Sequence, residues 1–270
     1  MTAKALAALL SASAELGIDT LDLADIYGNH STNALLGAAF AIAPELRRQF
    51  KLIAKIGIVL PSSAGNPRGI QHYNLSAKHL QKAFDETRFA LNVECFDTLM
   101  LHRFDPLIKP AETSDWLNQQ RALGSFANFA VSNFDARTLP VFDGLQAIRA
   151  NQIELSLQQS SALTDGTHVA TRARGAIVQA WSPLGGGELL ATNTPTGTRI
   201  QTVLSAMSAE FALDAASLLL RWVASVPGTQ IVLGSTRVDR LRDAIIACSK
   251  PLPHDAWYAM WEAARGFAVP

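Results

Sequence analysis

The fold of this chain is decided by residues 18–28, which read IDTLDLADIYG. A short run of apolar and β-branched residues ends there in two acids, a tyrosine and a glycine. Four later fragments repeat this plan and place Lys55, His102, 131–134 and 151–154 at or just after a short apolar run. Runs of this kind predict strands that are buried on both faces of a parallel sheet. The polar groups are therefore expected along one rim of that sheet.

Strand-like runs alternate with segments of helical period along the whole chain. Strands are expected near 18–23, 51–56, 97–102, 126–131, 150–155, 176–181 and 230–233, and helices over 3–16, 76–92, 113–123, 236–247 and 254–265. Ser76 and Thr113 are placed to begin two helices, and Gly124 to end one. This alternation is typical of βα units.

Two long loops, 57–75 and 183–200, each follow a predicted strand. They are therefore expected at the rim where (β/α)8 barrels build their active sites. No G-x-G-x-x-G sequence is present, which disfavours a Rossmann dinucleotide fold. No break in composition marks a linker. The prediction is a single α/β domain over residues 1–270, folded as a (β/α)8 TIM barrel.

The composition excludes several classes of protein. With 270 residues, 49% hydrophobic and 17% charged, the chain can bury a core and is not disordered. Its 23 basic and 23 acidic residues cancel, so nothing indicates a general affinity for nucleic acid. Cys95 and Cys248 have no metal-ligand spacing and fit a reducing, cytoplasmic compartment. No apolar run reaches the ~18–20 residues of a membrane helix. Residues 1–14 weakly mimic a signal peptide, but their leucines share one helical face and predict a helix.

Four side chains at the predicted rim can together transfer a proton. Asp22 and Lys55 carry opposite charges in apolar strands that are expected to be neighbours, where pairing offsets the cost of burial. By themselves they fit a structural salt bridge equally well. A phenol is a poor proton donor at neutral pH unless a cationic neighbour stabilises its anion, which Lys55 can do for Tyr27. His102 alone is more typical of a packed core residue, but beside the other three it can orient a substrate carbonyl.

In this order the fragments resemble the aldo-keto reductase family, over nearly the whole chain from Gly17 to Pro270. The resemblance is closest to a bacterial branch with the motifs D-x-A-D-I-Y-G and L-x-H-R-x-D-P, here 22–28 and 101–106. The family's catalytic tetrad falls on Asp22, Tyr27, Lys55 and His102. The resemblance implies that the tyrosine is the general acid, that the lysine and aspartate tune it, and that the histidine positions the substrate. It also implies reduction of a small aldehyde or ketone with hydride from NADPH.

The resemblance implies a binding site for NADP(H) as well. Its residues fall on Ser132, Asn133, Gln152, Trp181, Ser182, Leu184, Ser235, Arg237 and Arg240. In the family, a Ser-Asn pair and a glutamine hold the carboxamide, an aromatic ring stacks on the nicotinamide, and the loop that here begins at Ser182 faces the pyrophosphate. Trp181 would otherwise be a core aromatic residue. Ser235 and Arg240 match the pair that holds the 2′-phosphate, with Arg237 able to assist, which favours NADPH over NADH. No metal site is predicted.

The chain departs from the family at its start. Members have an N-terminal β-hairpin and a first barrel strand before the helix expected at 3–16, and this chain has no residues for either. Seven barrel strands are therefore expected instead of eight, with open edges at 18–23 and 230–233. A misassigned start, a truncation, or closure of the gap by another segment or a partner chain would each explain this. A monomer is expected, with a dimer through the open edges as the alternative. The chain also departs from the residues that are usual in the family at three single positions, Leu23, Ala130 and Ala244.

Three functions compete on this sequence. The first is an NADPH-dependent reductase, favoured by the complete tetrad and the Ser-Asn-Gln set. The second is a non-catalytic nicotinamide-binding or regulatory protein on the same fold, favoured by the missing first strand. The third is a hydrolase that uses Asp22 and His102, which would need a metal or a nucleophile at the rim, and the sequence has neither a ligand cluster nor a nucleophile elbow.

Overall fold

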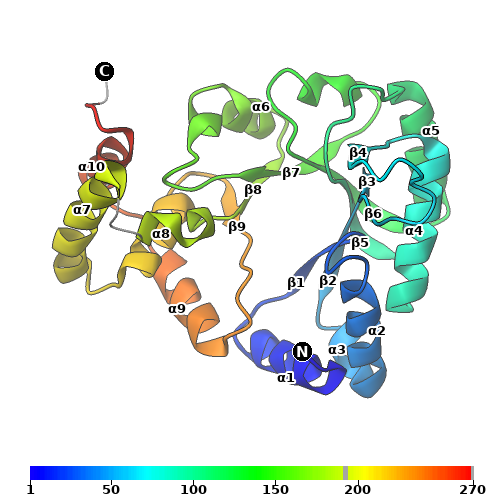
Figure 1. Cartoon of the computed structure of the whole chain (residues 1–270), viewed down its shortest axis with the longest axis horizontal. Helices are drawn as coiled ribbons and strands as arrows, with labels where there is room; N and C mark the ends of the chain where they lie inside the picture. The colour runs from blue at the N-terminus through cyan, green and yellow to red at the C-terminus, as the bar shows by residue number, and fades with distance from the viewer. Residues whose placement is uncertain (191–193, 269–270) are drawn as a thin grey trace. The chain divides into compact units, whose positions relative to one another are not determined.

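The computed structural model describes residues 1–190 and 194–268 of the chain. It divides into two compact units, Met1–Asn151 and Gln152–Pro270 (Figure 1). The boundary falls inside strand β7 (Ile148–Glu154), so residues 152–154 of that strand belong to the second unit. Each unit is described by itself below.

The first unit is built on strands in the order β1-β2-β5-β6-β7. Their bounds are β1 (Thr20–Ala24), β2 (Lys51–Ile56), β5 (Phe96–Leu101) and β6 (Phe126–Ser132), followed by β7. The pairs β1–β2, β2–β5 and β5–β6 are parallel, with Ala24 opposite Lys55 and Ile56 opposite Leu101. Strand β2 is buried at every position after Lys51, as a strand covered on both faces should be. Because the strands run the same way, the polar residues at their carboxyl ends meet at one edge.

Helices pack against this sheet and against one another. Their bounds are α1 (Ala3–Glu15), α2 (Thr32–Ile42), α3 (Pro44–Arg47), α4 (Ala77–Leu91), α5 (Pro110–Ala122) and the short η1 (Leu139–Phe142). The helices predicted over 3–16 and 76–92 are confirmed, and the Ser76 hydroxyl caps α4 by accepting from the His79 N–H at 3.4 Å.

The predicted start of α5 at Thr113 is wrong. The helix begins at Pro110, because proline suits the first helical position and loses no hydrogen bond there. Thr113 lies inside the helix, where its buried hydroxyl donates to the Leu75 carbonyl at 2.9 Å.

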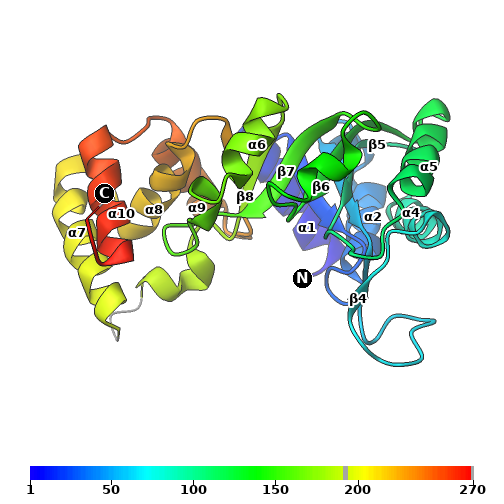
Figure 2. The same cartoon turned by 90° about the horizontal axis from the view of Figure 1, so that it is seen from above.

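Residues 57–75, called here the hairpin loop, are more ordered than the sequence predicts. They contain two short antiparallel strands, β3 (Ile58–Val59) and β4 (His72–Tyr73), in which Ile58 pairs with Tyr73. Figure 2 shows the loop projecting away from the helices of its unit. The Asn66 amide donates to the carbonyls of Leu60 and Ile70, both at 2.9 Å, and so closes the loop on itself.

The second unit continues the strand order from the end of β7 to β8 and β9. Its elements are η2 (Ser161–Leu163), α6 (Thr167–Ala173), β8 (Ile177–Trp181), η3 (Gly185–Leu190), α7 (Pro195–Phe211), α8 (Ala215–Ala224), β9 (Thr229–Ile231), α9 (Val238–Cys248) and α10 (His254–Arg265). The core centres on Trp222, whose ring stacks on Trp257 with centroids 4.7 Å apart. Each of the two indole N–H groups donates to the other residue's carbonyl at 3.0 Å.

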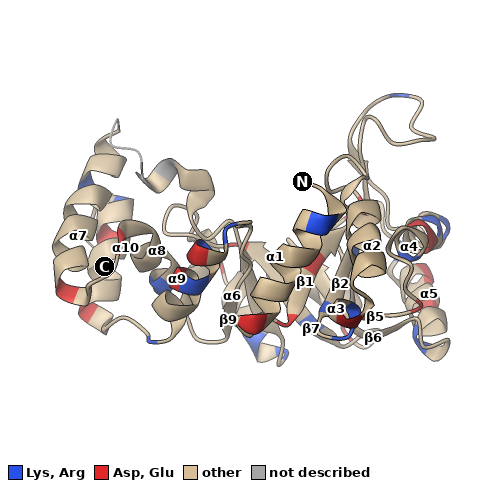
Figure 3. Cartoon of the chain, turned by 90° about the horizontal axis from the view of Figure 1, so that it is seen from below, with Lys and Arg blue, Asp and Glu red and all other residues tan. Residues whose placement is uncertain are grey.

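The seven strands predicted from the sequence are all present in the described residues. The region predicted as a loop over 183–200 instead holds η3 and the start of α7, and its residues 191–193 lie outside the described part of the chain. Basic and acidic residues are interspersed along each unit (Figure 3). Among the described residues, no single helix has the length and apolarity to cross a membrane. The helices α7 and α8 meet that test only when counted together, and they are bent by 88°.

Candidate active site

Asp22 and Lys55 form an ion pair at the carboxyl edge of the first unit's sheet. Lys55 Nζ donates to Asp22 Oδ2 at 2.5 Å, and the lysine is only 1% exposed. The strand register accounts for the contact, since Asp22 lies opposite Ile53 and side chains two residues apart share one face of a strand. Burial makes each charge costly without the other, so removing either partner leaves an uncompensated charge.

Tyr27 and His102 approach this pair from two other segments. Lys55 Nζ lies 5.0 Å from the centroid of the Tyr27 ring. The Tyr27 and His102 ring centroids are 6.1 Å apart, with the rings nearly perpendicular at 82°. All four residues of the predicted tetrad therefore come together within one unit, from the ends of β1, β2 and β5 and from residues 24–32, called here the tyrosine turn.

His102 is held as a neutral imidazole. Burial, with a smaller contribution from the positive charges of Lys55 and Arg103, lowers the pKa of His102 to about 3. Its Nδ1 atom is buried and has no hydrogen-bond partner among the residues that the structure describes. A neutral imidazole offers one donor and one acceptor, so His102 can hydrogen-bond a substrate oxygen without carrying charge.

Ser132 and Asn133 adjoin the tetrad at the end of β6. Asn133 has a left-handed backbone, with φ of +59°, and its amide donates to Ser132 Oγ at 2.8 Å and to the His102 carbonyl at 3.3 Å. Ser132 is buried at 1% exposure. The structure therefore brings the predicted Ser-Asn pair directly beside the strand end that carries the histidine.

Asp25 belongs to the same edge and was not predicted as a site residue. Burial raises the pKa of its carboxyl group to about 7, against smaller opposing effects from the N–H groups of Ile26 and Gly57, which donate to it. Its Oδ1 atom is buried and unpartnered within the described residues. The sequence signal was present, since Asp25 is the second acid of the 22–28 motif and follows a buried strand directly.

In the second unit, Gln152 and Trp181 lie on neighbouring strands. Gln152 is 2% exposed, and its amide donates to the Gln179 side chain on β8 at 3.3 Å. Trp181 ends β8 and is partly exposed. Ser182 follows with a left-handed φ of +53°.

The loop after β8 is a tight succession of turns. The Gly185 N–H donates to the Ser182 carbonyl at 2.8 Å, and the Gly187 N–H to the Leu184 carbonyl at 3.0 Å. Gly185, like Ser182, is left-handed, with φ of +57°. These internal hydrogen bonds fix the path of the loop that the family resemblance assigns to the pyrophosphate.

Ser235, Arg237 and Arg240 lie around the start of α9. Ser235 Oγ accepts from the Arg237 N–H at 3.2 Å. The Arg237 guanidinium is engaged by the Asp239 carboxylate, with one of the two hydrogen bonds at 3.1 Å. The Arg240 side chain is exposed and makes no hydrogen bond or ion pair with another residue that the structure describes, so its guanidinium is available to a phosphate.

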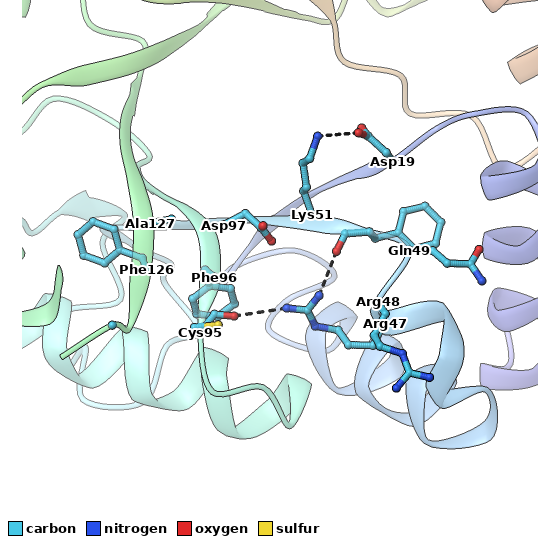
Figure 4. A pocket seen from close by; sticks show the side chains of 12 residues that line it. Asp19, Arg47, Arg48, Gln49, Lys51, Cys95, Phe96, Asp97, Phe126 and Ala127 are labelled. Carbon is cyan, nitrogen blue, oxygen red and sulfur yellow. Dashed lines mark hydrogen bonds and ion pairs between the residues drawn. The ribbon is translucent and has the colours of Figure 1, made fainter. Parts of the chain in front are cut away.

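A cavity of about 540 Å³ opens at the opposite end of the first unit's sheet (Figure 4). Most of its charged side chains are engaged, with Lys51 Nζ 2.7 Å from Asp19 Oδ2 and Arg47 donating to the Phe50 carbonyl at 3.0 Å. The Asp97 carboxylate accepts from a main-chain N–H of β2 at 2.8 Å. No tetrad residue lines this cavity, so it is not the candidate active site.

Two relatives resemble the chain over most of its length. The uncharacterized oxidoreductase YcsN of Bacillus subtilis (strain 168) is 33% identical over 260 residues, which cover 94% of this chain and 86% of YcsN. A 6-dehydroglucose reductase of Agrobacterium fabrum is 31% identical over 256 residues, which cover 94% of this chain and 85% of that enzyme.

A solved structure supports the fold. An aldo/keto reductase from Klebsiella pneumoniae, in complex with NADP and acetate, superposes with a TM-score of 0.77 at 19% identity, over 99% of this chain and 87% of the other. This likeness confirms the predicted α/β barrel fold class. The model of the aldo/keto reductase family matches residues 1–265, which include every residue of the converging tetrad. The chain therefore belongs to the aldo/keto reductase family.

Proposed function

We propose that this protein is an NADPH-dependent reductase of small aldehydes or ketones, with Tyr27 as the general acid. Members of its family are oxidoreductases. The observation that supports the proposal most is the position of the buried Lys55 ammonium, which is paired with Asp22 and lies 5.0 Å from the centroid of the Tyr27 ring.

The residues present fit a nicotinamide dinucleotide phosphate. Arg240 is an exposed guanidinium in the first turn of α9, with the Ser235 hydroxyl close by in sequence, and this donor set suits a 2′-phosphate. Ser132, Asn133 and Gln152 would hold the carboxamide, and Trp181 would stack on the ring, with Ser182 and Leu184 toward the pyrophosphate. When bound, the cofactor supplies hydride to the carbonyl carbon. The Klebsiella relative, whose structure contains NADP, supports the same cofactor here.

The chain's own residues supply the proton and the orientation. As negative charge develops on the carbonyl oxygen, the Tyr27 hydroxyl donates its proton to that oxygen. The Lys55 ammonium stabilises the phenolate that remains, and Asp22 holds the ammonium in place. The neutral His102 donates a hydrogen bond that orients the carbonyl, and Tyr27 regains its proton from solvent.

The substrate class is a small carbonyl compound. The Agrobacterium relative is named for reduction of 6-dehydroglucose, a sugar aldehyde, so polar hydroxyaldehydes belong in the first substrate screen. The low cysteine content favours a cytoplasmic location, and a monomer is the proposed oligomeric state.

The test is the substitution Tyr27→Phe, which removes only the hydroxyl. Carbonyl reduction should fall by at least ~10³-fold, because the proton donor is lost, while NADPH binding stays within about twofold. Tyr258→Phe on α10 is the matched control, since Tyr258 is 42% exposed on a helix that carries no predicted site residue. Undiminished turnover in Tyr27→Phe would refute the assigned role. Binding of NADPH without turnover of any carbonyl by the natural chain would favour a non-catalytic protein.

A further inference from the structure

The tyrosine turn has a strained main chain directly after Tyr27. Gly28, Asn29 and His30 have successive φ values of +58°, +52° and +69°. Residues with a Cβ atom pay roughly 1–2 kcal/mol each for this left-handed conformation. Asn29 and His30 therefore keep it only because their surroundings hold them.

The His30 ring is one of the groups that hold the turn. Its Nδ1 lies 3.0 Å from the Asp25 carbonyl, which can only accept, so Nδ1 carries the proton. Nε2 of a neutral ring is then an acceptor, and the Ser63 hydroxyl donates to it at 2.9 Å. Asp25 and His30 stand on either side of Tyr27 in sequence, so the ring closes the turn across the tyrosine.

The hairpin loop meets the turn at a second point. The Ser62 hydroxyl donates to Asn29 Oδ1 at 2.5 Å, so two consecutive serines hold the two left-handed residues that have side chains. Ser63 is itself fixed, because its Oγ accepts from the Leu60 N–H at 3.0 Å. The Asn66 amide also donates to the carbonyls of Leu60 and Ile70. Internal hydrogen bonds therefore hold the hairpin loop together where it contacts the tyrosine turn.

This segment is continuous with the strand that carries Lys55. The hairpin loop begins at Gly57, two residues after the lysine. The chain thus runs from Lys55 through the hairpin loop to Ser63, and from there through the His30 ring to the turn of Tyr27. The arrangement links the proposed proton donor to the cation that would stabilise its anion.

We propose that His30 is a positioning residue, which fastens the tyrosine turn to the hairpin loop through Ser63 and so fixes Tyr27 relative to Lys55. The inference rests on the proposed function for its effect on turnover. Its structural part, the coupling of the turn to the loop, stands on these hydrogen bonds alone.

The kinetic test uses His30→Ala, Ser63→Ala and the double variant. Each single change should lower kcat about 5- to 20-fold while the Kd for NADPH stays within twofold, because the phenol is displaced and the cofactor residues are untouched. The primary isotope effect on kcat with deuterated NADPH should increase, since proton donation and hydride transfer become slower. The double variant should be no slower than the slower single variant, because both remove one link. Unchanged kcat, or losses that multiply, would overturn the proposal.

Amide hydrogen exchange tests the coupling without using activity. Ser63→Ala lies outside the tyrosine turn in sequence, yet it should speed exchange of residues 26–32 at least fivefold. His72→Ala is the control in the same loop, since within the described residues its ring hydrogen-bonds only the Ile70 carbonyl, at 2.9 Å, and exchange of the turn should not change. Equal exchange in the natural chain and Ser63→Ala would overturn the inference. A natural chain without turnover would contradict the proposed function, and the exchange result would still decide this inference.

Discussion

The two groups of predicted site residues differ in how the protein holds them. In the first unit the tetrad comes from three neighbouring strands and the tyrosine turn, and its members lie close to one another. In the second unit, Ser182, Ser235 and Arg240 lie in a turn and at a helix start, and Arg240 is exposed. Proton transfer needs fixed distances, which a sheet register supplies. Cofactor binding needs accessible donors, which loops and helix starts supply.

The largest expected effect comes from a substitution within the tetrad of the first unit. Lys55→Met keeps most of the length of the side chain but removes the cation beside Tyr27 and the ion pair with Asp22. Carbonyl reduction should fall by at least ~10³-fold, because the phenolate loses its stabilising charge. The measurement is kcat with a small aldehyde, with NADPH binding followed by fluorescence.

The control for this change is Lys51→Met on the same strand. Lys51 pairs with Asp19 at 2.7 Å at the far end of β2, where the side chains are 63% and 59% exposed. An exposed pair contributes little because water and salt screen it, so turnover should hardly change. Similar losses in both variants would mean that Lys55 acts on folding and not on the reaction.

A smaller effect is expected from a substitution among the predicted cofactor-binding residues of the second unit. Arg240→Ala should weaken NADPH binding about 10- to 100-fold and NADH binding by less than threefold, because only NADPH has the 2′-phosphate. Quenching of tryptophan fluorescence measures both affinities, and Trp181→Phe identifies the part that comes from the ring proposed to stack.

Arg237→Ala sharpens this test within the same helix start. Arg237 is already engaged by Asp239, so its loss should cost less NADPH affinity than the loss of Arg240. A greater loss in Arg237→Ala would assign the phosphate to that residue. Equal losses for NADPH and NADH in Arg240→Ala would place the phosphate contact elsewhere.

Strand register explains what the sequence could predict. Short apolar runs specify strands, parallel strands bring their carboxyl ends to one edge, and the contact of Asp22 with Lys55 follows from that register. The same reasoning predicted that Asn133 and His102 share one rim, and the structure shows that they lie on neighbouring strand ends. The roles of these residues stay proposals, because contact alone does not establish chemistry.

Features that depend on tertiary contacts could not be predicted. Strands β3 and β4 have two residues each, too few for any periodic pattern, and the Asn66 side chain helps to hold their loop together. The bridge from His30 to Ser63 joins residues 33 positions apart that no strand register relates. The sequence shows that Asp25 follows its strand directly, but its partial burial and its contact with the Gly57 N–H arise only in the folded chain.

The smallest expected effect is a change in the free energy of unfolding on substitution of Asp25, at the edge of the first unit's sheet. Burial raises the pKa of its carboxyl group from 3.8 to about 7, so the folded chain binds a proton there that the unfolded chain has released. The stability that this proton gives is complete below pH 4 and is lost as the pH rises through 7. At pH 8 the fold contains a buried carboxylate, which the nearby Glu86 charge disfavours further.

Asp25→Asn should therefore raise the free energy of unfolding by about 1–2 kcal/mol at pH 8, less than the full pKa shift allows, because the amide also lacks a partner for one of its atoms. The gain should shrink toward pH 5, where the natural carboxyl group is already protonated. Urea unfolding at both pH values measures this difference. His102 contributes the opposite trend, since its lowered pKa costs stability as the pH falls below 6.5, but that contribution is common to both proteins and cancels. An equal difference at pH 5 and pH 8 would show that the Asp25 carboxyl group does not titrate between them, and that the buried edge of the first unit tolerates a carboxylate as readily as an exposed surface does.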